Sequence, residues 1–355
     1  MYIYIITLLM CYLFVLLNDA KENSESAKFP KKFFYIIITA LMLIIVGFRS
    51  DTVGIDTYAY KGEFLRIGRK NFDYLLNDKI LNEVGYAFSN ILFGKLGLPW
   101  EIYKLLMGAI FLIPAFILIY KKTDNPFYAL IFFITMGWWT YPMSTIRQSV
   151  AIGLTILAFL FEEKNKKLPF ISCILLAISF HNSAFIVLIY YVITKIPLNK
   201  KNVGIWAVLG LIITLLGITP LRNFVQEIML YFGKDYSSIE NTGGNLMEVF
   251  FILTLILGST FIGKEKDEIY VKYYKAVYLS AVILPIVKIN PTLFRIYQYF
   301  SIYLVVFIPM MLSRIKDKKI RLIGHLGYNT VCLYLLFTKT LIEINKLIPY
   351  SFFGD

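Results

Sequence analysis

The sequence predicts an all-α protein that crosses a membrane about twelve times and forms one integral membrane domain over residues 1–355. Three observations lead to this expectation. The chain is 58% hydrophobic and 17% charged, whereas soluble domains are about half apolar and a quarter charged. Its apolar residues form long runs that alternate with short basic connectors. No polar interval is long enough to fold as a soluble domain.

The apolar runs approach the roughly 20 residues that a helix needs to span a bilayer. They cover about 2–17, 33–48, 100–120, 126–140, 146–161, 168–181, 183–196, 203–217, 247–263, 269–287, 294–313 and 322–342. We expect the first run to be a retained span, because it has no basic segment before it and no small-residue cleavage site. The cysteines Cys11, Cys173 and Cys332 lie inside apolar runs and far apart, so neither a disulfide framework nor a cysteine metal site is predicted.

The connectors rich in lysine and arginine all fall on one side of the membrane when these spans are drawn. They are 21–32, 121–122, 162–167, 195–201, 263–268 and 313–321. By the positive-inside rule that side is the cytoplasm, which places both termini outside. The scheme requires that 83–97 lies in the outer interface or re-enters, as expected of a short segment that ends in Gly97-Leu98-Pro99. The net charge of +13 therefore indicates topology and contact with anionic lipid, not nucleic-acid binding.

The long connectors, 49–99 and 218–246, are expected on the extracytoplasmic side, where loops of this length are uncommon unless they are functional. The first begins with Arg49, where the second span ends. Gly54 permits a turn next to the acceptor Asp56, and Tyr58 and Tyr60 supply aromatic rings. These residues form either a helix cap with an aromatic belt, or part of an outward-facing site for sugar or phosphate.

Two further outer positions carry groups suited to acid–base chemistry. Glu83 precedes the expected interfacial helix, where it either caps the helix through the dipole or binds an acceptor as a base. His181 and Asn182 lie at the tip of a tight apolar hairpin. They either satisfy loop carbonyls or contact a phosphate or hydroxyl near neutral pH.

Two arginines lie in the first turns of outer-facing helices. Arg147 is followed by Gln148 and an apolar run, and Arg295 is followed by Tyr297 and Tyr299. Ionisable groups at this depth are costly and are functional candidates. The alternative is that each arginine extends to the lipid headgroups within an aromatic belt.

Four of these candidates come from different helices but lie on the same side at similar depth: Arg49, Arg147, His181 and Arg295. This pattern predicts an anion-binding site open to the outer leaflet, and the forked guanidinium group suits a diphosphate. Acidic and histidine residues do not cluster with metal-ligand spacing, so no metal and no cofactor are expected.

The ordered motifs FRSDTVGIDTYAY, NEVGY, STIRQSVA, FHNSAF and FRIYQYF resemble those of the EpsG family of Wzy-like exopolysaccharide and O-antigen polymerases, from about Arg49 to Phe300. The resemblance implies a GT-C-like enzyme in the bacterial cytoplasmic membrane. Such an enzyme joins undecaprenyl-diphosphate-linked repeat units at the outer face. No motif matches within 218–246. The motif residues are Arg49, Gly54, Asp56, Tyr58, Glu83, Gly85, Tyr86, Arg147, Gln148, His181 and Arg295.

These observations lead to a prediction of the residues involved. The expected catalytic group is Asp56, Glu83, His181, Arg147 and Arg295, and the expected substrate-binding group is Arg49, Gly54, Tyr58, Tyr60, Tyr86, Gln148, Asn182, Tyr297 and Tyr299. Arginines would hold the diphosphate, and either Asp56 or Glu83 would orient or deprotonate the acceptor hydroxyl. The expected partners are the lipid-linked glycans, the bilayer, a chain-length regulator and a flippase, with no nucleic acid.

Other classes of protein also fit part of the pattern. A flippase or other transporter would have a similar number of spans, but its charges tend to lie near the midplane of repeated halves. An outer-face ligase or acyltransferase would share the diphosphate-binding arginines and differ in its acceptor.

Overall fold

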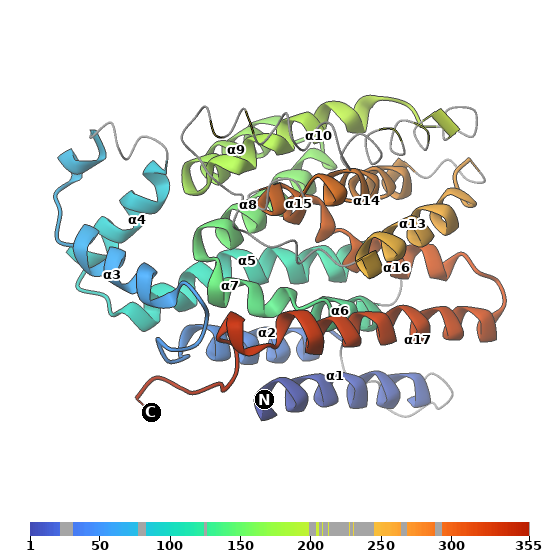
Figure 1. Ribbon diagram of the computed structural model, residues 1–355, viewed down its shortest axis with the longest axis horizontal. Coiled ribbons are helices and arrows are strands. Elements are labelled where there is room, and N and C mark those ends of the chain that lie inside the picture. Colours follow the sequence, from blue (N-terminus) through green and yellow to red (C-terminus); the bar gives the residue numbers. More distant parts are fainter. Residues whose placement is uncertain are drawn as a thin grey trace. The chain divides into compact units, whose positions relative to one another are not determined.

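The computed structural model describes residues 1–21, 31–76, 83–123, 126–198, 245–263, 268–287 and 293–354, and isolated positions between 204 and 230 (Figure 1). Across these ranges the chain is all-α, as expected, and contains no β-strand. Most of the expected span 203–217 and outer loop 218–246 falls outside the described residues.

The chain divides into two compact units. Unit 1 comprises Met1–Ala184 and Lys318–Asp355, and unit 2 comprises Phe185–Asp317. The single membrane domain expected over residues 1–355 stays a prediction.

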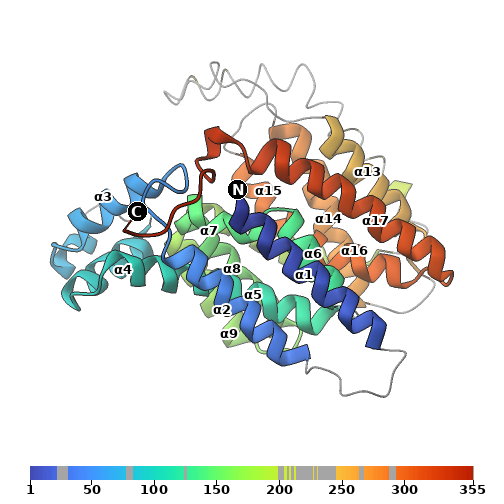
Figure 2. The ribbon, with the colours of Figure 1, turned by 90° about the horizontal axis from the view of Figure 1, so that it is seen from below.

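Unit 1 contains the longer apolar helices of the N-terminal half and the last long helix of the chain. Its elements are α1 (Tyr2–Lys21), α2 (Lys31–Gly47), α3 (Thr57–Ile67), η1 (Phe72–Leu76), α4 (Val84–Lys95), α5 (Trp100–Lys122), α6 (Pro126–Thr135), η2 (Trp138–Thr140), α7 (Tyr141–Ser144), α8 (Ile146–Glu162), α9 (Lys167–Phe180), α17 (Lys318–Leu335), η5 (Leu336–Thr340) and η6 (Glu343–Asn345). The axes of α1, α2, α5, α6 and α17 run roughly along one direction (Figures 1 and 2).

Glycines bring α2, α5 and α8 into close contact. A Cβ atom at Gly47 would lie 2.6 Å from the Leu105 Cβ, and one at Gly153 would lie 2.1 Å from the Ile110 carbonyl oxygen. Small residues at such crossings let helix backbones approach closely, which is a common way of packing helices in membranes. The three helices therefore form the packed centre of unit 1.

The C-terminal segment contacts both the loop after α2 and the start of α1. The Ser50 N–H donates to the Ser351 carbonyl (2.9 Å), and the Gly54 N–H donates to the Lys346 carbonyl (2.7 Å). The Tyr4 hydroxyl donates to the Leu347 carbonyl (2.7 Å). The beginning of α1, the C-terminal segment and this loop therefore lie on the same side of unit 1.

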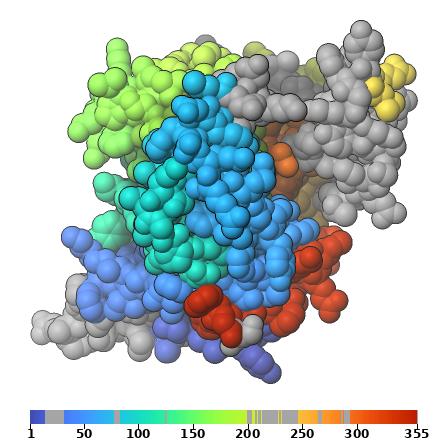
Figure 3. Space-filling view, turned by 90° about the vertical axis from the view of Figure 1, so that its left-hand side faces the viewer, coloured from blue at the N-terminus to red at the C-terminus, as the bar shows by residue number. Residues whose placement is uncertain are grey.

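On that side, α3 and α4 pack against each other and form a separate layer, which Figure 3 shows in blue and teal. The α4 helix has 12 residues, fewer than the roughly 20 that a spanning helix needs. The interfacial placement expected over 83–97 stays a prediction.

Unit 2 contains α10 (Ile186–Lys195), α13 (Asn245–Ser259), α14 (Glu268–Val287), α15 (Phe294–Ser301) and α16 (Leu304–Ser313). The α14 helix contacts each of the other four. A short 3-10 turn, η3 (Asn182–Phe185), connects the two units along the chain.

In the described ranges, three helical segments are long and apolar enough to cross a membrane: Trp100–Lys122, Phe294–Ser313 and Lys318–Thr340. Shorter apolar helices cover Tyr2–Leu13, Lys32–Gly47, Pro126–Thr135, Lys167–Phe180, Asn182–Lys195 and Leu246–Ser259. The twelve spans and the GT-C-like arrangement stay predictions. The helix expected over 126–140 ends earlier, at Thr135, because the chain turns at Gly137, whose φ of 77° lies in the left-handed region.

Candidate functional site

Arg49 lies at the end of α2 and is 0% exposed. Its Nε donates to the Val53 carbonyl (3.2 Å), its Nη2 donates to the Met143 carbonyl (2.9 Å), and its Nη1 donates to the Val46 carbonyl. One guanidinium group thus joins the end of α2, the loop after it and α7. These bonds favour a structural part for Arg49, and its contact with substrate stays a prediction.

Gly54 holds the same loop against α7. Its φ is +99°, and a Cβ atom there would lie 2.1 Å from the Met143 carbonyl oxygen. Only glycine fits this combination of left-handed backbone and close approach. Thr57, the first residue of α3, also directs its hydroxyl to the Val53 carbonyl (2.7 Å).

Asp51 fixes the other side of the loop. Its carboxylate accepts hydrogen bonds from Lys61 and from the Trp100 indole N–H, the latter at 2.8 Å. Burial raises the pKa of Asp51, but the Lys61 and Trp100 hydrogen bonds and the charge of Lys104 outweigh it and lower the pKa below its usual value. The loop between Arg49 and Thr57 is therefore a scaffold that sets the start of α3.

The next residues along α3 divide between solvent and the interior. Asp56 precedes the helix, is exposed and makes no side-chain capping bond, and Tyr58 is 61% exposed. Tyr60 is buried and faces α4. Among the predicted residues in this segment, Tyr60 contacts Arg147 and Tyr86.

Glu83, Arg147 and His181 meet where α4, α8 and α9 come together. Arg147 Nη1 donates to one Glu83 carboxylate oxygen, and His181 Nδ1 lies 2.9 Å from the other. The side chains are 23% exposed for Glu83, 32% for Arg147 and 11% for His181. Three predicted catalytic residues, far apart in the sequence, thus form one connected cluster.

Local geometry explains how these residues meet. Gly85, two residues after Glu83, packs against the end of α9, where an added Cβ would lie 2.2 Å from Ser179 Oγ. His181 ends α9, with its N–H bonded to the Ala177 carbonyl (2.9 Å). A larger residue at position 85 would have to displace the Ser179 side chain, so glycine favours this close approach of α4 to α9.

Two tyrosine rings flank Arg147. Its guanidinium carbon lies 5.4 Å from the centre of the Tyr60 ring and 5.2 Å from that of Tyr86. The two rings contact each other edge to face at 6.1 Å. Cation–π contacts of this kind hold an arginine in place while leaving some of its N–H groups for other partners. The Tyr86 hydroxyl donates to Glu63 Oε2 (3.0 Å), which brings a second carboxylate beside the cluster.

Glu63 is not among the residues that the sequence predicted for the site. A signal for it was present, because Glu63 follows Tyr60 by three residues on a helix, and this spacing places both residues on neighbouring positions of one face. Nothing in the sequence, however, indicated which face of α3 would turn toward Arg147.

The electrostatics of the cluster favour an ionised Glu83. Burial raises the pKa of Glu83, but the hydrogen bond from His181 and the positive charge of Arg147 outweigh it and lower the pKa below its usual value. Two nitrogens of the cluster, Arg147 Nε and His181 Nε2, are buried and have no hydrogen-bond partner among the described residues. Arg147 Nε is a buried donor, and a buried donor without a partner is costly, so an anion that met it would gain binding energy there. His181 Nε2 is a second donor only when the imidazole is protonated, because Nδ1 faces the Glu83 carboxylate.

The remaining candidates are more scattered. Gln148 is 4% exposed inside unit 1, and Asn182 is exposed at the turn after His181. Arg295, Tyr297 and Tyr299 belong to α15 of unit 2, where both tyrosines are buried and Arg295 is exposed.

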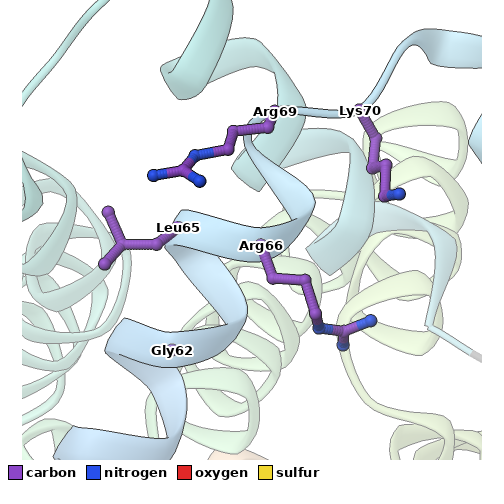
Figure 4. A pocket seen from close by; sticks show the side chains of 5 residues that line it. All are labelled: Gly62, Leu65, Arg66, Arg69 and Lys70. Atoms are coloured by element: carbon purple, nitrogen blue, oxygen red, sulfur yellow. The ribbon is translucent and has the colours of Figure 1, made fainter.

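The described residues contain no group of three or more histidine, cysteine, aspartate or glutamate side chains that could hold a metal ion. A shallow hollow on the outward side of α3 is lined by Gly62, Leu65, Arg66, Arg69 and Lys70 (Figure 4). In Figure 4 the Arg66 and Arg69 guanidinium groups point to different sides of the helix. The hollow therefore lacks the convergent donors of an anion site.

Comparison with known proteins assigns the chain to a family. The model of the EpsG family matches residues 32–352, which is nearly the whole chain. No curated protein and no solved structure matches it significantly. The chain belongs to the EpsG family, whose members have a role like that of exopolysaccharide or O-antigen polymerases. The apolar helices agree with a membrane protein of this kind.

Proposed function

We propose that this member of the EpsG family polymerises a surface polysaccharide by joining undecaprenyl-diphosphate-linked repeat units at the outer face of the bacterial cytoplasmic membrane. The observation that carries the proposal is the cluster of Glu83, Arg147 and His181, formed by three helices and partly open to solvent. A cation and an imidazole held side by side by one carboxylate suit the binding of a leaving diphosphate.

The reaction transfers a growing glycan from its diphosphate carrier to a new repeat unit. The acceptor hydroxyl oxygen forms a bond to the anomeric carbon, and the bond from that carbon to the diphosphate oxygen breaks. The hydroxyl proton passes to a base, and undecaprenyl diphosphate leaves with the electron pair of the broken bond. Negative charge therefore grows on the diphosphate, and groups that stabilise this charge speed the reaction.

Arg147 is the main group that stabilises the negative charge on the leaving diphosphate. It has N–H groups beyond the one bonded to Glu83, and the Tyr60 and Tyr86 rings hold its guanidinium plane. His181 supplies the second contact. Since Nδ1 faces Glu83, Nε2 is the nitrogen left for the diphosphate, to which it donates when the imidazole carries both protons. Nε2 is buried, so this contact requires the side chains around it to move.

Glu83 is best assigned as a positioning residue. Both of its oxygens are engaged by cluster members, and its lowered pKa makes it a poor proton acceptor. Asp56 is exposed at the start of α3. The sequence left Asp56 and Glu83 open as alternatives for the base. These surroundings weaken Glu83, and the Asp56 side chain has no hydrogen bond or ion pair with the described residues of the cluster, so neither is assigned as the base.

The test compares arginine variants in a strain that lacks its own copy of the gene. Arg147→Ala should leave single repeat units on the cell surface and abolish long chains, because charge stabilisation of this kind contributes about 100- to 1000-fold to a rate. Arg69→Ala is the matched control, because Arg69 is an exposed arginine of α3. Arg295→Ala tests whether α15 of unit 2 contributes a second cation.

Each result is read from the glycans on the surface and on the lipid carrier, with the amount of protein in the membrane measured in parallel. Long chains from Arg147→Ala at normal protein level would overturn the proposal. Loss of all surface repeat units would indicate a flippase, and accumulation of lipid-linked polymer would indicate a ligase.

A further inference from the structure

Glu63 is a second carboxylate beside the cluster, and the mechanism above gives it no part. It lies on α3 and is half-buried, with Oε2 accepting the hydrogen bond of the Tyr86 hydroxyl (3.0 Å). The Tyr86 ring also contacts Arg147, whose guanidinium carbon lies 5.2 Å from the ring centre. The same tyrosine therefore contacts the guanidinium group through its ring and the carboxylate through its hydroxyl.

The surroundings of Glu63 differ from those of Glu83. Glu83 is held by a cation and an imidazole, one on each oxygen. Glu63 forms no ion pair with any described residue, and no hydrogen bond from the described part of the chain reaches its Oε1. Glu63 has the charge of Arg147 nearby but no direct ion pair. A partly buried carboxylate of this kind is only partly compensated for the cost of its desolvation. Its free oxygen is thus available to a ligand that donates a hydrogen bond.

The geometry also explains why Glu63 stays free. The Arg147 guanidinium group lies over the Tyr86 ring and pairs with Glu83, so the cation and the Glu63 carboxylate are two separate binding groups. The Tyr86 hydroxyl holds the Glu63 side chain in one orientation, which reduces the cost of binding a second partner through Oε1.

We propose that Glu63 binds the acceptor sugar and serves as the base of the transfer. Oε1 accepts the hydrogen bond of the attacking hydroxyl and takes its proton as the new bond to the anomeric carbon forms and the bond to the diphosphate breaks. The protonated carboxyl group then releases the proton to water. This assignment rests on the proposed polymerase function, and it divides the site into a diphosphate subsite at Arg147 and His181 and an acceptor subsite at Glu63.

The competing explanation is structural: Glu63 would only satisfy the Tyr86 hydroxyl. Two variants separate these explanations. Glu63→Gln keeps a carbonyl oxygen for the Tyr86 hydroxyl but is no longer a base. Tyr86→Phe removes the hydrogen bond and keeps both the carboxylate and the ring over Arg147. A structural role predicts that Tyr86→Phe is at least as harmful as Glu63→Gln, and the proposal predicts the reverse.

The experiment uses the purified full-length protein in lipid nanodiscs with lipid-linked repeat units extracted from a polymerase-deficient strain. Glu63→Gln should lower the rate of polymer formation by about 100-fold or more, because loss of a general base has an effect of this size. Tyr86→Phe should lower it by about tenfold or less, as expected for one lost positioning hydrogen bond. Asp73→Asn, at an exposed acid of η1, should leave the rate unchanged.

Binding of the lipid-linked repeat unit distinguishes the two subsites. Glu63→Gln should retain this binding, whereas Arg147→Ala should lose it. A polymer-forming rate of Glu63→Gln within about threefold of wild type, less than 1 kcal/mol in the barrier, would overturn the inference. So would a rate for Tyr86→Phe as low as that of Glu63→Gln. If Arg147→Ala lost polymer formation in either case, the proposed function would still hold. If Arg147→Ala also formed polymer, the proposed function itself would fail.

Discussion

Arg49 and Arg147 both lie at the end of an apolar helix, but unit 1 uses them differently. Arg49 is 0% exposed and donates to backbone carbonyls of three segments. Arg147 is 32% exposed and contacts the Glu83 carboxylate and two tyrosine rings. Backbone carbonyls cannot turn away without unfolding their segments, whereas side chains can share an arginine with a ligand. The nature of the partner therefore separates a structural arginine from one that is suited to bind a substrate.

The largest expected effect concerns the structural role of Arg49. Arg49→Ala should lower the free energy of unfolding by about 3–5 kcal/mol, because it removes three buried hydrogen bonds of a charged donor. The Thr57 hydroxyl can serve only one of the Val53 and Met143 carbonyls at a time. The protein should then be depleted from the membrane, as measured by immunoblotting of an epitope tag. Arg147→Ala is the matched variant and should accumulate normally. Equal amounts of both variants would show that Arg49 is not a structural residue.

Two glycine substitutions test how closely the loop after α2 packs on α7. Gly54→Ala should destabilise the protein by about 2–4 kcal/mol, because the position has a φ of +99° and the new Cβ would meet the Met143 carbonyl. Gly62→Ala should be neutral or stabilising by about 0.5–1 kcal/mol, since Gly62 lies inside α3 and a Cβ there meets nothing within 4 Å. Melting temperatures in detergent measure both effects. A Gly54→Ala protein as stable as wild type would contradict the close packing of this loop on α7.

The smallest expected effect is the pH dependence of the stability that Glu83 contributes. The pKa of Glu83 is lowered from 4.5, so its interactions stabilise the protein fully above about pH 4.5, and this stability is lost as the pH falls through the lowered pKa. Glu83→Gln should be less stable than wild type by about 1–2 kcal/mol at neutral pH. The two melting temperatures should converge below pH 4.5. Asp51 titrates in both proteins, so the difference between them isolates Glu83. A constant difference across the acid range would show that Glu83 is not paired as described.

Much of the helical structure was predictable because apolar runs report burial directly. The α2 and α5 helices begin and end within a few residues of the runs at 33–48 and 100–120. The error at 126–140 arose because Thr135 to Thr140 is as apolar as the helix before it. Hydrophobicity cannot show that Gly137 adopts a left-handed conformation and ends α6.

The candidate site was predictable in its residue types and only partly in its arrangement. Glu83, Arg147 and His181 were selected because ionisable groups are rare beside apolar runs, and the structure brings them together. Arg49, which was expected to share their site, is bonded to backbone carbonyls and its contact with substrate stays a prediction, and Glu63 was not among the predicted residues. Both outcomes depend on which side chains face one another across different helices, and this information is absent from local patterns.

The sequence by itself determined the all-helical class, the family and the polar residues from which a site could be built. Composition and hydrophobic periodicity are properties of the chain, so they need no tertiary contacts to be read. The tertiary structure decided which of these residues are structural and which form the cluster. Arg49 donates to carbonyls that the packing of α2 and α7 brings to it. Arg147 instead meets Glu83 and two rings, and His181 reaches the other Glu83 oxygen because Gly85 lets α4 approach α9.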